Sequence, residues 1–261
     1  MLRFVVSSGE RTISHFAGTV KVWIPYIAKA TEDVQALVIY YLNNGKHLEL
    51  VKESYYDKDK KALVYVTDHF SEYAVGYNKV SFLDISGGWF ESYVNYLAAR
   101  SIVHGDGAGK FNPNKHISRA EFVQIIAGLD GVNLSAYKGS AFIDVDESEW
   151  YAPAIGWALE QGIVKGTGAD KFSPKAHITR QDIATIILRY ADKAGYDTPK
   201  AVALSFDDNH SIAEYAAPSI SILQQIGIID GKPGNLFDPE GLGTRAQSAK
   251  MMAELLKYII K

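Results

Sequence analysis

The C-terminal two thirds of the chain contains three copies of one unit, and this repetition limits the folds that the chain can adopt. Windows of 31 residues that begin at Trp89, Trp150 and Tyr215 align without a gap. Five positions are identical in all three windows: Ile102/Ile163/Ile228, Gly105/Gly166/Gly231, Phe111/Phe172/Phe237, Pro113/Pro174/Pro239 and Arg119/Arg180/Arg245. A unit this small cannot bury a core of its own, so we predict that the three copies share one.

The first segment of each unit predicts a helix with one buried face. Val94, Leu97 and Ala98 have the i, i+3, i+4 spacing of such a helix. The corresponding apolar residues in the other copies are Ile155, Ala158 and Leu159, and Ile220 and Leu223. Because glycine commonly stops helices, we expect each helix to end at the segment that contains Gly105, Gly166 or Gly231.

The second helix of each unit begins with a capping sequence. The sequences Ser118-Arg119-Ala120-Glu121, Thr179-Arg180-Gln181-Asp182 and Thr244-Arg245-Ala246-Gln247 fit or approximate a capping box, in which the hydroxyl and the fourth side chain satisfy backbone amides. Apolar residues follow at helical spacing, and Ser248 is the polar exception in the third copy. In the loop between the helices, we expect the Phe of Phe-x-Pro to anchor the chain and the Pro to stiffen it.

Residues 1–78 follow a different pattern, which predicts short strands. One strand is expected close to Met1, and the others at Val20–Ile24, Ala36–Leu42, Leu48–Val51, Ala62–Thr67 and Tyr73–Tyr77. Asn44-Gly45 predicts a type I′ hairpin turn, and Asp57-Lys58-Asp59-Lys60 predicts a charged turn. These strands favour a small antiparallel β-sandwich, expected to be the C-terminal part of a longer module. Without clustered acids, a His pair or a Gly-rich loop, a binding or spacer role is favoured over catalysis.

Composition excludes several classes of function. The 261 residues carry a formal net charge of −3, which gives no basic field for nucleic acid. There is no cysteine, so no disulfide, thiolate nucleophile or Cys-ligated metal site is expected. No apolar run approaches the roughly 18 residues of a membrane-spanning helix, so we expect no membrane insertion. The stretch Met1–Glu10 has a charge within its apolar part and is not a signal peptide, so export is expected to depend on sequence outside this chain.

The repeats resemble the S-layer homology (SLH) domain over residues 80 to 261, in order, spacing and copy number. The matching pieces are Phe82-Leu83-Asp84, Phe142-Ile143-Asp144, Phe206-Asp207-Asp208, Gly162-Ile163-Val164-Lys165-Gly166, Phe172-Ser173-Pro174 and Ile117-Ser118-Arg119-Ala120-Glu121. The resemblance implies an α+β chain: a β-rich module, residues 1–78, then a mainly helical, pseudo-threefold bundle of repeats at 79–139, 140–203 and 204–261. It also implies non-covalent attachment to the bacterial cell wall, through a secondary cell wall polymer or peptidoglycan-linked polysaccharide bound in grooves between repeats. The terminal sugar is often pyruvylated N-acetylmannosamine.

The resemblance implies a set of ligand-binding residues that also makes chemical sense. Each arginine stands in the first turn of a helix, where free amides and the helix dipole favour an anion, and its guanidinium forks onto a carboxylate. Aromatic faces suit sugar C–H groups, and glycines permit close approach to the backbone. The predicted ligand-binding residues are Asp84, Trp89, Gly105, Arg119, Asp144, Trp150, Gly166, Arg180, Asp207, Tyr215, Gly231 and Arg245.

Structural explanations stand beside these assignments. The acidic residues either cap the first helices or orient an arginine, and Trp89 and Trp150 are either ligand contacts or wedges between repeats. His116 and His177 are explained by repeat equivalence rather than by a metal site, and no cofactor is expected. The third copy departs most from the family pattern, so its groove is expected to bind weakly or only to support the fold.

Three functions remain open for a chain of this kind. The first is a non-enzymatic wall-anchoring module of an extracellular protein, located in the cell wall or S-layer. The second is the anchoring tail of a larger secreted, glycan-active enzyme, whose catalytic carboxylates would have to lie outside this chain. The third is a structural subunit whose β-module self-associates in a surface array.

Overall fold

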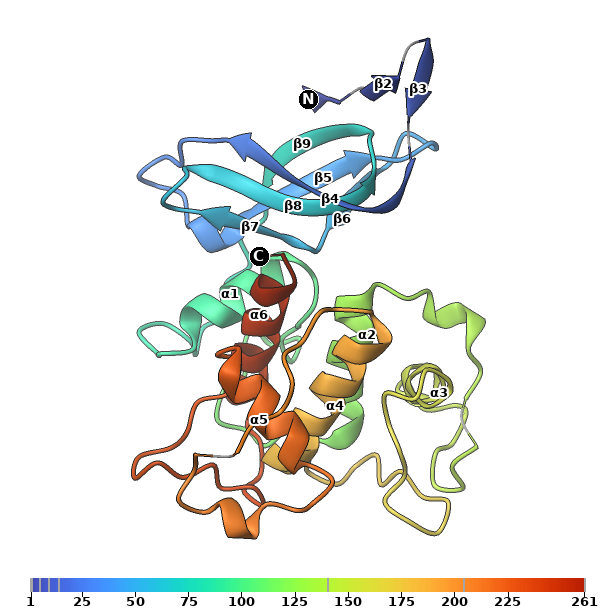
Figure 1. Cartoon of the computed structure of the whole chain (residues 1–261), viewed down its shortest axis with the longest axis vertical. Helices are drawn as coiled ribbons and strands as arrows, with labels where there is room; N and C mark the ends of the chain where they lie inside the picture. Colours follow the sequence, from blue (N-terminus) through green and yellow to red (C-terminus); the bar gives the residue numbers. More distant parts are fainter. Residues whose placement is uncertain are drawn as a thin grey trace. The chain divides into compact units, whose positions relative to one another are not determined.

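A computed structural model describes residues 2–4, 6–8, 10–13, 15–139, 141–203 and 205–260. The chain divides into two compact units, residues 1–110 together with 255–261, and residues 111–254. All of the strands lie in the first unit and most of the helices in the second, which confirms the predicted α+β class (Figure 1).

The first unit contains a β-sandwich. One sheet has the strand order β1-β9-β5-β6 and the other the order β4-β8-β7. The strands are β1 (Leu2–Arg3), β4 (His15–Pro25), β5 (Leu37–Leu42), β6 (Leu48–Val51), β7 (Ser54–Asp57), β8 (Ala62–His69) and β9 (Glu72–Tyr77), with β2 (Val6–Ser8) and β3 (Arg11–Ile13) forming a separate pair. The core residues Ile24 and Leu63 come from one sheet and Leu37, Ile39 and Tyr73 from the other, so the predicted sandwich is confirmed.

Two details of the β-module differ from the prediction. Strands β2, β3 and β7 were missed, and the four residues of β7 begin and end with polar side chains. The hairpin between β5 and β6 is present, but the predicted type I′ turn is wrong, since neither Asn44 nor Gly45 has a positive φ. Instead Lys46 is left-handed at φ 59°, which gives a three-residue connection. The strand expected near Met1 is β1, and Met1 itself lies outside the described residues.

The helix α1 (Glu91–Ala99) of the first repeat belongs to the first unit and is attached there through Arg100. This arginine is 0% exposed. It donates hydrogen bonds to the backbone carbonyls of Ser54 (2.8 Å), Leu37 (3.0 Å), Gln35 (3.2 Å) and Tyr96 (3.0 Å). Gln161 and Ile226 occupy the equivalent position in the other repeats, so this attachment is specific to the first copy.

The second unit carries the remaining helices of the repeats. These are α2 (Arg119–Asp130), α3 (Ala152–Glu160), α4 (Arg180–Lys193), α5 (Ala217–Gln225) and α6 (Arg245–Ile260), of which residues up to 254 lie in this unit (Figure 1). Single turns of 3-10 helix occur at Leu134–Ala136 and Asn209–Ser211, and another at Val34–Ala36 in the first unit.

Three backbone hydrogen bonds close these repeats into a ring. Ile117 N–H donates to the Gly243 carbonyl at 3.0 Å, Gly243 N–H to the Ile178 carbonyl at 2.9 Å, and Ile178 N–H to the Ile117 carbonyl at 3.1 Å. The three donors are equivalent residues of the three copies, each directly before the capping residue of its second helix. The predicted pseudo-threefold arrangement is therefore built at this ring from cyclic, equivalent contacts.

Local hydrogen bonds and backbone conformation set the start of each second helix and the end of each first helix. Ser118 with Glu121 and Thr244 with Gln247 form the reciprocal capping bonds, whereas Thr179 caps α4 and Asp182 points elsewhere. The expected stop at Gly105, Gly166 and Gly231 is wrong, because α1, α3 and α5 each end six residues earlier. The left-handed stop residues are Ser101, Gly162 and Gly227.

The identical isoleucines follow these stop residues. Each donates its amide back to the helix across five residues, as in Ile163 N–H to the Ala158 carbonyl at 2.9 Å, while Gly162 donates to Leu159. This is the Schellman pattern, which pairs the last carbonyls of a helix.

In the second unit, the polar exception Ser248 is fully buried, and its hydroxyl has no hydrogen-bond partner within the described residues.

Candidate functional site

The three identical arginines connect each repeat to the next. Their Nε atoms donate to the carbonyls of the identical phenylalanines: Arg119 to Phe172 (2.9 Å), Arg180 to Phe237 (2.8 Å) and Arg245 to Phe111 (2.7 Å). Each guanidinium also lies over the ring of that phenylalanine, 4.6 to 4.9 Å from its centre. Arg119 and Arg180 are only 6% and 4% exposed. The arginines thus hold the repeats together, whatever else they bind.

The helix amides that were expected to be free for an anion are already used. The amide of Arg119 donates to the Ala176 carbonyl at 2.9 Å, and that of Ala120 to the Pro174 carbonyl at 3.0 Å. The same pair of bonds recurs at the starts of α4 and α6. An anion at these helix starts would therefore have to contact side chains rather than backbone N–H groups.

A groove of about 510 Å³ lies along α4. It is lined by Arg119, Lys165, Gly166, Thr167, Asp182, Thr185, Ile186, Arg189 and Tyr215. Arg119 belongs to the first repeat, the loop around Gly166 to the second, and Tyr215 to the third. Predicted site residues from three different copies therefore meet in one groove, although no single copy brings its own set together there.

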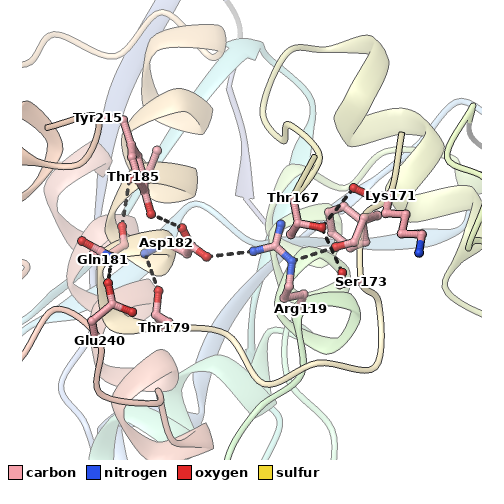
Figure 2. A network of polar contacts seen from close by, with 11 residues as sticks. Arg119, Thr167, Lys171, Ser173, Thr179, Gln181, Asp182, Thr185, Tyr215 and Glu240 are labelled. Carbon is pink, nitrogen blue, oxygen red and sulfur yellow. Dashed lines mark hydrogen bonds and ion pairs between the residues drawn. The ribbon is translucent and has the colours of Figure 1, made fainter. Parts of the chain in front are cut away.

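Asp182 is the centre of a polar network in this groove (Figure 2). One carboxylate oxygen accepts from Arg119 Nη1 at 2.9 Å, and the other accepts from the Tyr215 hydroxyl at 2.7 Å. Burial and the hydrogen bond to Asp182 raise the pKa of Tyr215, so the phenol remains a donor at neutral pH. The Arg119 guanidinium thus already donates hydrogen bonds from Nε to the Phe172 carbonyl and from Nη1 to the Asp182 carboxylate.

The groove carries more positive than negative charge. Arg119, Lys165 and Arg189 face the single carboxylate of Asp182 among its lining residues. Within the part of the chain that the structure describes, the side chains of Lys165 and Arg189 form neither a hydrogen bond nor an ion pair. Burial lowers the pKa of Arg189 from its usual value, and Asp182 counteracts this shift. Neither residue was predicted from the sequence, because no other copy has a matching residue at either position.

The exposed aromatic residues share one position in the repeats. Trp89, Trp150 and Tyr215 are 58%, 59% and 54% exposed, which leaves a flat face of each ring open. Trp150 lines a second, smaller groove of about 240 Å³ together with Glu121, His116 and His177. The two imidazole rings are 5.4 Å apart there. Within the described residues, no three His, Asp or Glu side chains are grouped as a metal site would require.

The acidic residue of Phe-x-Asp orders the Phe-x-Pro loop. Asp144 accepts hydrogen bonds from the amides of Phe172 and Ser173, both at 2.8 Å. In the third repeat the same bonds, at 2.8 and 2.7 Å, go to Asp208 rather than to the predicted Asp207. The spacing of Phe206 to Asp208 equals that of Phe142 to Asp144 and would have identified the right residue. Asp207 instead accepts from the Asn235 side chain at 2.8 Å.

At the identical glycines of the loop, neighbouring atoms of the protein leave no space for a side chain. A Cβ at Gly166 would lie 2.6 Å from the Lys171 carbonyl and 2.9 Å from the Phe142 ring, and Gly105 and Gly231 are similarly enclosed. Of the remaining predicted residues, Asp84, Trp89 and Gly105 lie in the first unit. Arg180 and Arg245 occupy the same structural position as Arg119, at the other two contacts between repeats.

The repeats match a known family in three places. The S-layer homology domain matches residues 81–123, 141–184 and 205–249, just over half of the chain. The chain belongs to this family. Each matched SLH segment runs from the Phe-x-Asp motif into the second helix of its repeat. Among the residues described, no helix has both the length and the apolar character that crossing a bilayer requires.

Similar proteins include enzymes and S-layer proteins. An amylopullulanase of Thermoanaerobacterium thermosulfurigenes is 32% identical over 252 residues, covering 94% of this chain and 13% of that protein. Exoglucanase XynX of Acetivibrio thermocellus is 36% identical over 68% of this chain and 16% of its own length. An S-layer protein of Bacillus thuringiensis subsp. finitimus is 27% identical over 67% of this chain and 21% of its own. The SLH chain thus spans only about 13% to 21% of these relatives, and the first match extends into the β-module.

Proposed function

We propose that this chain anchors a bacterial surface protein non-covalently to the cell wall, by binding a secondary cell wall polymer in the groove along α4. The observation that carries the proposal is the meeting of Arg119, the Gly166 loop and Tyr215 from three repeats in one cationic groove of about 510 Å³. The family membership supports the same role, because relatives include proteins named as S-layer and cell surface proteins. An extracellular location, in the wall or S-layer, belongs to the proposal.

The ligand that suits this groove best is an acidic sugar, such as a terminal amino sugar with a pyruvyl ketal. The ketal carboxylate would pair with Arg119, whose Nη2 donates no hydrogen bond within the described residues. The open face of Tyr215 would cover sugar C–H groups. The other predicted residues are also proposed to contact the polymer: Asp84, Trp89, Gly105, Asp144, Trp150, Arg180, Asp207, Gly231 and Arg245. Weaker binding is proposed at the third repeat.

Binding to wall polymer with and without its ketal tests the proposal. The whole chain should sediment with purified pyruvylated polymer and should lose most binding after mild acid removes the ketal. Equal binding to both forms would overturn the pairing of a carboxylate with arginine. Failure to bind any wall preparation would overturn the anchoring function itself.

Two alternatives concern the larger protein. The amylopullulanase and exoglucanase relatives favour an anchoring tail on a glycan-active enzyme, in which the present chain is the binding part and not the catalyst. The S-layer relatives favour a structural subunit that self-associates in an array. Sedimentation velocity of the chain separates these, since only the second predicts reversible assembly. We also propose the boundaries 1–78, 79–139, 140–203 and 204–261 for the module and its repeats.

A further inference from the structure

The groove along α4 holds two positive side chains that the protein itself leaves unneutralised. Arg189 projects from α4, seven residues after Asp182 and four after Thr185, and all three line the groove. Lys165 lines it from the loop beside Gly166. Neither Arg189 nor Lys165 forms an ion pair or a side-chain hydrogen bond within the described residues, whereas Arg119 is already bonded to Asp182 and Phe172.

Arg189 is partly buried, although it has no ion-pair partner within the described residues. Its desolvation is unfavourable unless a negative group completes the site, and Asp182, the only carboxylate among the lining residues, is shared with Arg119 and Tyr215. An arginine fork in such a setting is suited to a carboxylate or phosphate. The charge of the groove exceeds what one ligand carboxylate would neutralise, since three cations face one aspartate.

The two cations are specific to the second repeat. At the position of Arg189 the first repeat has Gly128 and the third has Glu254. At the position of Lys165 they have His104 and Asp230. Both positions lie outside the residues that are identical in the three copies, so they distinguish one groove rather than maintain the fold.

We propose that the groove along α4 selects a glycan with two anionic groups, the first near Arg119 and the second, on the neighbouring sugar, bound by Arg189 and Lys165. The second group is a carboxylate or a phosphate. This inference rests on the proposed wall-polymer function and adds the charge of the ligand. It makes Arg189 and Lys165 the specificity-determining residues of this repeat.

Titration calorimetry of the whole chain with defined disaccharides tests the inference. Four ligands are needed: a neutral disaccharide, one with a terminal pyruvyl ketal, and two that carry in addition a carboxylate or a phosphate on the second sugar. We expect the doubly charged ligands to bind about tenfold more tightly than the singly charged one. Arg189→Gln and Lys165→Gln should each remove most of this difference, and each should weaken the binding of the doubly charged ligands much more than that of the singly charged one.

Lys200→Gln is the matched control, because Lys200 is exposed in the same unit and does not line the groove. It should leave all affinities unchanged. Lys165 is exposed, so its variant keeps the test valid even if Arg189→Gln lowers the melting temperature. Equal affinity for singly and doubly charged ligands, or a preference that survives both variants, would overturn the inference. If no disaccharide binds, the proposed function fails together with it.

Discussion

The carboxylate of Asp182 bonds Arg119 Nη1 at 2.9 Å, so the groove along α4 already contains an anion of the protein's own. A ligand carboxylate that seeks the same face of Arg119 must share it with this aspartate. Under the proposed function, Asp182 therefore limits the affinity of this groove for acidic sugars, and a mutation of Asp182 tests this limit.

Asp182→Asn should increase affinity for pyruvylated wall polymer about fivefold, because removing one negative charge from a partly buried groove favours an incoming anion by about 1 kcal/mol. The amide oxygen can still accept from Arg119, so the cost in stability should stay near 1 kcal/mol. Calorimetry and thermal melting measure the two effects. The control is Glu160→Gln, which removes an exposed carboxylate outside the groove. Unchanged or weaker binding by the Asp182 variant would contradict the competition.

Asp208→Asn should destabilise the second unit, and Asp207→Asn should not. Asp208 accepts two backbone amides of the Phe-x-Pro loop, and losing charge-assisted bonds of this kind costs about 1–3 kcal/mol. Asp207 makes one exposed side-chain contact, so the loss of stability in Asp207→Asn should stay within about 0.5 kcal/mol. Urea unfolding of both variants provides the comparison, and equal losses would show that the loop does not depend on Asp208.

Acid should weaken the second unit through Asp144 and Asp208. Burial disfavours their ionisation, but the two amides that each accepts outweigh this and hold the pKa of both carboxyls below the usual value. Such groups contribute stability above their unfolded pKa of about 3.9 and lose it as pH falls through the folded pKa. The urea midpoint should therefore fall steeply below about pH 4. The double variant Asp144→Asn/Asp208→Asn should show a flatter profile than the wild type.

Arg100→Met should destabilise the first unit by about 3–5 kcal/mol, because it removes the donor of four hydrogen bonds to backbone carbonyls, three of them buried. Gln161→Met, at the equivalent position of the second repeat, should have little effect. Hydrogen exchange can locate the loss: amides of β5, β7 and α1 should exchange faster in the Arg100 variant, while those of α4 keep their protection. Uniform protection in both variants would rule out Arg100 as the attachment of α1.

The helices that the three copies share could be predicted from the sequence, whereas residues that act in one copy only could not. The apolar stripes and the capping residues gave the helices, because the same packing is repeated three times. The attachment by Arg100 and the cations Lys165 and Arg189 were missed, since each occurs in one copy only. The grooves could not be assembled from sequence, because Arg119 serves the loop of the next repeat rather than its own.

Residues with a left-handed backbone account for two wrong predictions of local structure. Ser101 stops α1 with φ 55° where the other copies have Gly162 and Gly227, so the stop position is not a glycine in all three copies, and the prediction fell on the next position that is, at residues 105, 166 and 231. In the hairpin between β5 and β6, Lys46 is the left-handed residue, although Asn44-Gly45 directly precedes it. In both places a hydrogen bond of the surrounding structure stabilises a conformation that the residue alone disfavours.

The cyclic bonds among Ile117, Ile178 and Gly243 fix the copy number of the second unit. In an open array each repeat contacts only its neighbours, and further repeats can be added at an end. Here the last copy bonds the first, so a fourth copy would have nowhere to insert without breaking the circuit. A nascent chain that stops before Gly243 lacks two of the three bonds, and the bundle can be completed only after the third copy has been synthesised.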